Sequence, residues 1–361
     1  MEHHNPITGI IGGQKFITFG EIMLRLTPPN YDKIRVANSF EVGYGGSEAN
    51  IALALANLGV DSTFFSVVPN NSLGKSAIRM LRSNDVHCTP VVLTTPEETP
   101  THRLGTYYLE TGYGVRPSKV TYDRKNSAIT EYDFEKVDVD ALLEGFDWLH
   151  LSGITPALSK SCGDFILKLM RSAKEKGLTV SFDGNFRSLL WSWEDARDYC
   201  TMCLPYIDVL FGIEPYHLWK DDSDHSKGDW KDGLSMQPSY EAQDEVFNAF
   251  VARYPNLKCI ARHVRTAHSG SENSLKAFMW FEGHTFESKQ FTFNILDRVG
   301  GGDAFASGLI YAYMNGYKPM EMVNFAVASS VIKHTLHGDG NITDDVDSIR
   351  NLMNMNYDIK R

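Results

Sequence analysis

The sequence predicts an α/β fold with a mainly parallel central sheet, helices on both faces of that sheet and a small additional β-sheet. Short apolar runs rich in Val, Ile, Phe and Thr alternate with helix-like segments, and this alternation is typical of parallel sheets. Two segments, about 25–46 and 101–128, interrupt it with Tyr, Val, Thr and turn residues but little helical periodicity. We expect them to be antiparallel strands that pair over one end of the central sheet.

The individual elements follow from short sequence patterns. The expected core strands read KFITFG at 15–20, STFFSVV at 62–68, WLHLSG at 148–153, LTVSFD at 178–183, IDVLFG at 207–212 and LKCIARHV at 257–264. Helical periodicity and stop signals predict helices at 47–59, 72–84, 159–177 and 240–255. The polar stretch at 220–238 is expected to be a surface insertion.

Composition bounds the class of protein. The chain has 361 residues, of which 42% are hydrophobic and 22% charged, as in soluble globular proteins. We expect residues 1–14 to be a flexible tail and residues 15–361 to form one domain. The net charge of −10 disfavours nucleic-acid or membrane-surface partners, because such partners attract basic faces. No apolar run reaches bilayer length and no secretory signal is evident, so we expect a cytoplasmic protein without a membrane partner.

The five cysteines support the same compartment, because an odd and sparse set is typical of reduced thiols. Cys200 and Cys203 form a C-x-x-C in a helix-like run. The sequence has no second pair that would complete a zinc site. We therefore expect both to be buried helix residues.

The segment DRVGGGD, at 297–303, follows an expected strand and opens an expected helix. A helix start presents unpaired N–H groups and a partial positive charge, and Gly300, Gly301 and Gly302 let that backbone approach an anion closely. A carboxylate at the same place, Asp303, fits phosphoryl transfer, which needs an acceptor that orients the attacking hydroxyl. The residues fit equally well a plain aspartate N-cap beside a tight turn, and this motif alone does not decide between the two.

A second glycine segment, VGYGGSEAN, opens the first expected helix. Taken alone, it favours a plain turn at Gly45 and Gly46, with Ser47 as N-cap and Glu48 in the first helical turn. The alternative is that the glycines admit a ligand close to the backbone. Asn50 would then offer that ligand both a donor and an acceptor.

Together the two segments resemble the paired signatures of the ribokinase-like (PfkB) carbohydrate kinases, G-G-x-x-x-N near the first helix and D-x-x-G-x-G-D far downstream. The resemblance covers the chain from about Lys15 onward. It implies a ribokinase-like α/β fold in which the two inserted segments form a β-sheet lid over a sugar. It further implies that Asp303 is the catalytic base, that the amides of 300–302 form the anion hole for ATP phosphate, and that Gly46 and Asn50 contact the sugar.

A narrower resemblance is to the 2-keto-3-deoxygluconate kinases. VTYDRKNSA, at 120–128, is similar to their Y-x-R-x-x-S-A lid segment, and DGNFRSLLW, at 183–191, to their D-x-N-x-R segment. The sugar contacts that this resemblance implies are Tyr122, Arg124, Arg187, Asp339 and Tyr107, with Tyr108 as a rival to Tyr107. Arginine matches a planar carboxylate with paired N–H groups, so two arginines in these contexts indicate a sugar that carries an acid group.

The chain departs from the family pattern in two informative places. Arg298 replaces the Thr that often follows the first aspartate of the downstream motif, and we expect it to contact a phosphate or the nucleotide. Phe211 lies three positions before Glu214, where the metal-linked N-x-x-E segment of the family has Asn, so no protein ligand for a metal is assigned. The resemblance still implies ATP and Mg²⁺, with the Mg²⁺ held largely by ATP phosphates and water.

The sequence therefore predicts an ATP-dependent sugar-acid kinase, with conversion of 2-keto-3-deoxygluconate to its 6-phosphate as the leading hypothesis. The expected partners are the small-molecule sugar acid and ATP. Another ribokinase-like sugar kinase, for fructose or 5-keto-2-deoxygluconate, is the alternative within the fold. An inactive sugar-acid-binding sensor is the alternative from a different class. A homodimer formed through the lid strands is also expected.

Overall fold

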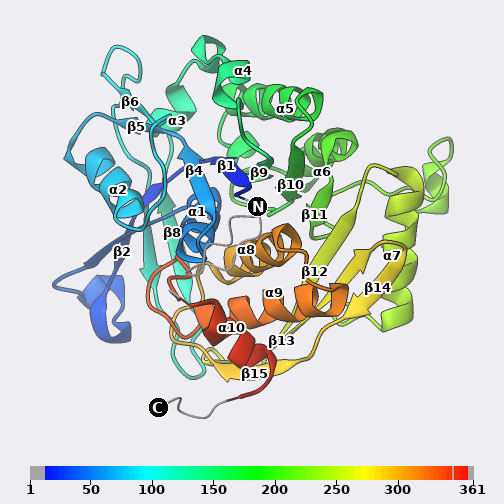
Figure 1. Ribbon diagram of the computed structural model, residues 1–361. Helices are drawn as coiled ribbons and strands as arrows, with labels where there is room; N and C mark the ends of the chain where they lie inside the picture. Colours follow the sequence, from blue (N-terminus) through cyan, green and yellow to red (C-terminus); the bar gives the residue numbers. More distant parts are fainter. Residues whose placement is uncertain (1–12, 344, 357–361) are drawn as a thin grey trace, which may run out of the picture.

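The central sheet has nine strands in the computed structural model, which describes residues 13–343 and 345–356 (Figure 1). Its parallel part runs in the order β4 (Asp61–Phe65), β1 (Lys15–Phe19), β9 (Trp148–Ser152), β10 (Thr179–Asp183), β11 (Val209–Phe211) and β12 (Cys259–Ala267). Three antiparallel strands complete it, namely β13 (Glu272–Phe281), β14 (His284–Glu287) and β15 (Phe291–Asn294). The expected mainly parallel sheet is confirmed.

Helices cover both faces of this sheet, as the layers in Figure 1 show. One face packs on α1 (Ser47–Asn57), α8 (Gly301–Met314) and α9 (Pro319–Lys333), and the other on α5 (Lys160–Glu175), α6 (Trp193–Cys203) and α7 (Tyr240–Arg253). Neighbouring residues Phe16 and Ile17 of β1 belong to different core clusters, because successive strand residues point to opposite faces. Burial on both faces explains why the core strands read as continuous apolar runs.

Six further α-helices and strands lie outside the central sheet and the helices listed above. They are α2 (Ser72–Arg82), α3 (Ala128–Glu131), α4 (Val139–Leu142), α10 (Val346–Met353), β5 (Val67–Pro69) and β6 (Val92–Thr94). Among the residues that the structure describes, no helix combines the length and the apolar character needed to cross a bilayer. Most of the expected N-terminal tail, 1–14, lies outside the described residues.

The two inserted segments form a separate sheet of four strands, β2 (Met23–Thr27), β3 (Glu41–Gly45), β7 (Thr106–Glu110) and β8 (Lys119–Asp123), in the order β3-β2-β7-β8. We refer to it as the second sheet. Each segment folds back as an antiparallel hairpin, as expected, but β2 and β7 pair in parallel. The expectation of antiparallel pairing throughout was wrong. The pairing between the two segments joins the first strand of each hairpin, β2 and β7, and these two strands run in the same direction.

Two local expectations have clear outcomes. Cys200 and Cys203 are buried in α6, as predicted. The stretch 220–238 is not simply a surface insertion, because Asp229 is buried within it. Its carboxylate forms ion pairs with Arg197 at 2.8 Å and with Lys231 at 2.7 Å. This polar segment therefore contains buried ion pairs, and the prediction of a surface insertion was wrong for the part around Asp229.

A buried ion-pair network ties the second sheet to the core. Arg25, on β2, donates from Nη1 to Asp339 Oδ1 at 2.5 Å and from Nη2 to Asp297 Oδ2. The hydroxyl of Tyr107, on β7, donates to the other oxygen of Asp339. All four side chains are buried, and each carboxylate has Arg25 as its ion-pair partner.

Replacement of Arg25 by methionine should destabilise the fold strongly. It leaves Asp297 and Asp339 as buried carboxylates without their cation, and breaking a buried ion pair on one side costs about 3–5 kcal/mol. The matched control is Arg35→Met, because Arg35 is exposed and surface substitutions change stability by about 0.5 kcal/mol or less. Urea unfolding of both variants measures the difference. Equal midpoints would contradict a structural role for the network.

Candidate active site

The turn before α8 is built by glycines. Gly300 is the N-cap of α8 with φ 83°, a left-handed conformation that favours glycine. A Cβ at Gly300 would lie 1.9 Å from the carbonyl oxygen of Asp339, and a Cβ at Gly301 would lie 2.3 Å from the His334 ring. No side chain of the described residues caps this helix start. Its end therefore keeps the character of an anion-binding site.

Asp303 is the third residue of α8, so the interpretation as an N-cap was wrong. Its Oδ1 accepts a hydrogen bond from the Ser47 hydroxyl at 2.8 Å, and its Oδ2 accepts one from Asn50 Nδ2 at 2.7 Å. Burial raises the pKa of Asp303 above its ordinary value, although the hydrogen bonds from Asn50 and Ser47 act in the opposite direction. The carboxylate is thus fixed in orientation by the start of α1.

The segment GGSEAN does not cap α1 through the Ser47 side chain, as the plain capping interpretation expected. The N-cap of α1 is Gly46, without a side-chain cap. Ser47 instead binds Asp303, and Glu48 is buried and accepts hydrogen bonds from Ser152 and Thr155, both at 2.7 Å. The prediction that Ser47 is the N-cap was wrong, because its hydroxyl binds Asp303, whereas Glu48 does lie in the first turn of α1 as predicted.

One cavity of about 650 Å³ brings the predicted residues together. It lies between the second sheet and the carboxyl ends of core strands, where ligands bind in open α/β sheets. The predicted site residues that line it are Gly46, Asn50, Tyr107, Tyr122, Arg124, Arg187, Arg298, Gly300, Gly301, Gly302, Asp303 and Asp339. Residues more than 250 positions apart in sequence, such as Ser47 and Asp303, therefore share one site.

The rivalry between Tyr107 and Tyr108 is resolved by strand alternation. Tyr107 lines the cavity and binds Asp339, whereas Tyr108 packs edge-on against Phe40, with ring centroids 6.0 Å apart. Successive residues of β7 point to opposite faces of the second sheet. Only Tyr107 faces the site.

The two arginines predicted to bind the sugar carboxylate, Arg124 and Arg187, differ in their burial and in their ion pairing. Arg124 is buried and donates from Nε to Glu21 Oε2 at 2.8 Å, and Glu21 Oε1 accepts from Ser127 at 2.5 Å. Arg187 is exposed to the cavity, and its Nη1 donates to the main-chain oxygen of Phe186 at 3.1 Å. In the part of the chain that the structure describes, no carboxylate forms an ion pair with Arg187. Among the described residues Arg187 therefore has no direct ion-pair partner, although its charge acts on the nearby carboxyl groups of Asp183 and Asp303 in the direction that lowers the pKa of each.

Several residues of the site were not assigned from the sequence. Glu21, Asp183 and Arg265 line the cavity. Asp183 ends β10, and burial together with the nearby charge of Asp303 raises its pKa to about 7. A carboxylate directly after a buried strand was the available signal for Asp183. Arg265 lies within a regular strand and gave no local signal.

Carboxylates suitable for a magnesium ion lie beside the glycine turn. Asp183 and Glu214 line a smaller cavity of about 260 Å³ next to Gly302, and oxygen ligands suit Mg²⁺. Within the described residues, these two carboxylates do not belong to a group of three converging metal ligands. They therefore fit an ion that takes most of its ligands from phosphate and water.

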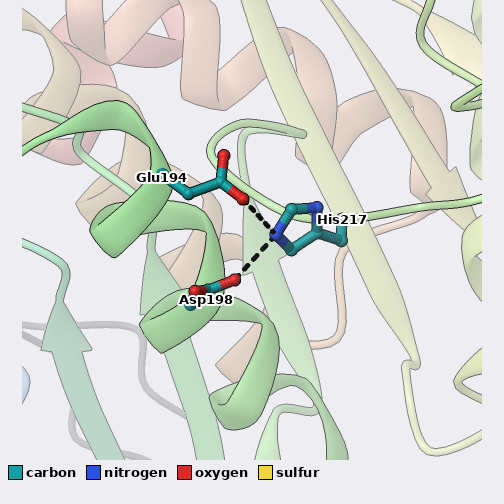
Figure 2. Close-up of side chains that lie close together, drawn as sticks. All are labelled: Glu194, Asp198 and His217. Carbon is teal, nitrogen blue, oxygen red and sulfur yellow. Dashed lines mark hydrogen bonds and ion pairs between the residues drawn. The ribbon is translucent and has the colours of Figure 1, made fainter. Parts of the chain in front are cut away.

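A second group of possible metal ligands lies outside the cavity. Glu194 and Asp198, exposed on α6, face His217 (Figure 2), whose Nε2 is 2.9 Å from Asp198 Oδ1 and 3.9 Å from Glu194 Oε1. None of the three lines the main cavity. The contacts are those of an ordinary surface ion pair that holds His217 against α6.

Comparison with known proteins agrees with this geometry. Residues 14–215 match the model of the pfkB family carbohydrate kinases. The chain belongs to the pfkB family. The kinase is 32% identical to a 2-dehydro-3-deoxygalactonokinase of Haloferax volcanii over 90% of this chain and 92% of the relative. It is 27% identical to a 2-dehydro-3-deoxygluconokinase of Bacillus subtilis, over 90% of each chain.

The fold comparison gives the same family. The crystal structure of a 2-dehydro-3-deoxygluconokinase from Thermotoga maritima superposes with a TM-score of 0.84 at 36% identity. The match covers 94% of this chain and 99% of that one. The ribokinase-like fold and the assignment as a carbohydrate kinase, both expected from the sequence, are confirmed.

Replacement of Gly300 by alanine should both destabilise the fold and strongly impair this carbohydrate kinase. The new Cβ must displace the Asp339 carbonyl, and a shift of about 1 Å in a catalytic element can lower the rate about a hundredfold. The control is Gly316→Ala at the other end of α8, where φ is 64° and nothing lies within 4 Å. The Gly316→Ala variant should lose only about 1–2 kcal/mol of unfolding free energy, the cost of a left-handed conformation for a residue with a Cβ. Phosphoryl-transfer rates and thermal unfolding of both variants test this, and a fully active Gly300→Ala enzyme would refute it.

Proposed function

We propose that this kinase transfers the γ-phosphate of ATP to the 6-hydroxyl of a 2-keto-3-deoxy sugar acid, with 2-keto-3-deoxygluconate as the leading substrate. The observation that carries the proposal is that Arg124, Arg187 and Asp303 line a single cavity. An acid group at one end of the sugar and a reactive hydroxyl at the other then have matching partners. The names of the Bacillus subtilis and Thermotoga maritima relatives support the same substrate.

Arg187 supplies the charge for the sugar carboxylate, because it has an open guanidinium and only main-chain partners in the described residues. Arg124 keeps its Nε and Nη2 on Glu21, so its Nη1 group is left for the substrate. A carboxylate held by guanidinium N–H groups forms charge-assisted hydrogen bonds, which are stronger than neutral ones. Arg124 and Arg187 therefore provide the local positive charge that selects a sugar acid, although the protein as a whole has a net charge of −10.

Asp303 acts in this proposal as the base that takes the proton of the attacking hydroxyl. Ser47 and Asn50 hold its two oxygens in place, so the carboxylate does not need to reorient during the reaction. The amides at Gly300–Gly302 stabilise charge on the transferring phosphoryl group. The second sheet covers the sugar and excludes water that would otherwise consume ATP.

Asp183 and Glu214 are the residues that would hold Mg²⁺, directly or through water. When bound, the ion would neutralise phosphate charge. Arg298 lines the cavity beside the glycine turn, and we assign it to the phosphates of ATP.

The second sheets of two subunits would form the expected homodimer, for which the exposed side chains Val36 and Val42 provide apolar area.

The second candidate substrate is the C4 epimer of 2-keto-3-deoxygluconate. The Haloferax volcanii relative is named for 2-dehydro-3-deoxygalactonate, which differs from 2-keto-3-deoxygluconate only at C4. A panel of both epimers, 5-keto-2-deoxygluconate and fructose, with ADP release as the readout, decides between them. Binding of a sugar acid without ADP release would instead support a sensor.

Replacement of Asp303 by asparagine should lower kcat by about a hundredfold to ten-thousandfold, the usual contribution of a general base. Sugar affinity, measured by calorimetry, should change little, because Asn preserves the shape of the side chain. In the wild type, kcat/KM should fall as the pH drops through the Asp303 pKa, since the base must be ionised. Because the pKa of Asp303 is raised, this acidic fall in kcat/KM should occur at a pH above the ordinary aspartate pKa of about 3.9.

The control for Asp303→Asn is Glu175→Gln, which removes an exposed charge on α5 and should leave turnover and its pH profile unchanged. Near-normal turnover in Asp303→Asn would rule out Asp303 as the base.

Replacement of Arg187 by leucine should raise KM for 2-keto-3-deoxygluconate about tenfold to hundredfold, the range for a lost hydrogen bond to a charged group. Arg187 is the cleaner test than Arg124, because removal of Arg124 also leaves Glu21 buried without its cation. The ratio of kcat/KM for the acid to that for fructose should fall by the same factor. A wild-type enzyme that prefers fructose to either acid would overturn the proposed substrate class.

A further inference from the structure

The wall of the cavity beyond the glycine turn carries two arginines close together. Arg265 projects from β12, and Arg298 lies in the turn just before α8. Throughout residues 13–343 and 345–356, neither side chain forms a hydrogen bond or ion pair with a carboxylate. The partner that Arg265 does have is neutral, since the Asn273 side-chain oxygen, in the better orientation of that amide, accepts from Arg265 Nη1 at 3.3 Å.

This pairing of like charges is unfavourable in the free protein. Partial burial and the neighbouring Arg298 guanidinium together lower the pKa of Arg265 to about 10. Buried or half-buried arginines are normally paired with an acid. A repulsive pair that faces a cavity is the arrangement expected where a polyanionic ligand supplies the missing charge.

The positions of the two side chains indicate which part of a ligand they would meet. His263, two residues before Arg265 on the same strand, comes within 3.8 Å of the Cβ position of Gly302. Residues at spacing two share one face of a strand, so Arg265 continues the wall that begins at the helix start. The main-chain oxygen of Arg298 accepts from the Gly301 amide at 3.4 Å. The two arginines thus flank the glycine turn from β12 and from the preceding loop.

We propose that Arg265 and Arg298 together form a clamp for the phosphate chain of the bound nucleoside triphosphate. The inference rests on the proposed kinase function and extends it, because it assigns Arg265 a role and gives Arg298 a partner. Each guanidinium donates to phosphate oxygens beside the glycine turn, while Ser47 and Asn50 hold Asp303 for the sugar. Arginine suits this task because its planar fork binds phosphate through two parallel hydrogen bonds.

The test is calorimetric titration of the full-length protein with ATP and ADP, in the presence of Mg²⁺ and without sugar. Arg265→Met and Arg298→Met should each weaken ATP and ADP binding about tenfold to hundredfold, as expected for a lost charge-assisted hydrogen bond. The Kd for 2-keto-3-deoxygluconate, titrated separately, should stay within about threefold of the wild-type value. Arg265→Lys should recover part of the ATP affinity, because it restores the charge but not the fork.

The matched control is Arg171→Met, an exposed arginine on α5, which should bind ATP and sugar as the wild type does. The clamp is overturned if both methionine variants bind ATP like the wild type. It is also overturned if sugar affinity falls as much as ATP affinity, since that would indicate a general disturbance of the site. Failure of the proposed function looks different, because the wild type would then bind ATP but release no ADP with any sugar acid.

Discussion

The charge balance of Arg25 is the constraint on which the geometry of the site depends. Its guanidinium neutralises Asp297, at the start of the glycine segment, and Asp339, in the loop after α9. Asp297 also accepts from the amides of Val299 and Gly338, both at 3.1 Å. One buried cation therefore fixes the entry to the anion-binding turn, the loop behind it and the first strand of the second sheet. Displacement of any of these would leave a charge buried without a partner, which is strongly unfavourable.

Close backbone packing adds to this electrostatic constraint. Gly300 abuts the carbonyl of Asp339, and a Cβ at Gly45 would lie 2.1 Å from the carboxylate of the same aspartate. The two glycine segments, far apart in sequence, thus touch the same residue from two sides. The start of α1 then supplies Ser47 and Asn50 to Asp303. The sugar side and the phosphate side of the cavity are parts of one rigid assembly rather than two sites placed near each other.

Much of this was predictable, and the failures have physical reasons. The core strands and the two inserted strand segments follow from local patterns, whereas most of the residues around the cavity were expected only through the family resemblance. Ser47 was misread as an N-cap because a capping interpretation is complete at the level of local sequence, and only its tertiary contact with Asp303 overrides it. Arg25 was missed because its partners lie 272 and 314 positions away. Arg265 looks like any residue of a strand, and nothing in the polar stretch 220–238 distinguishes the buried Asp229 from its exposed acidic neighbours.

The separation of Arg25 from Asp339 has a consequence for the order in which the protein is made. During synthesis the first hairpin of the second sheet leaves the ribosome early, but Arg25 lacks both carboxylates until residues 297 and 339 have followed. The parallel pairing of β2 with β7 likewise waits for residue 106. A nascent or truncated chain therefore contains the sugar-side residues without a supported cover or a phosphate turn. The lining of the cavity is therefore complete only once the chain has been made as far as Asp339.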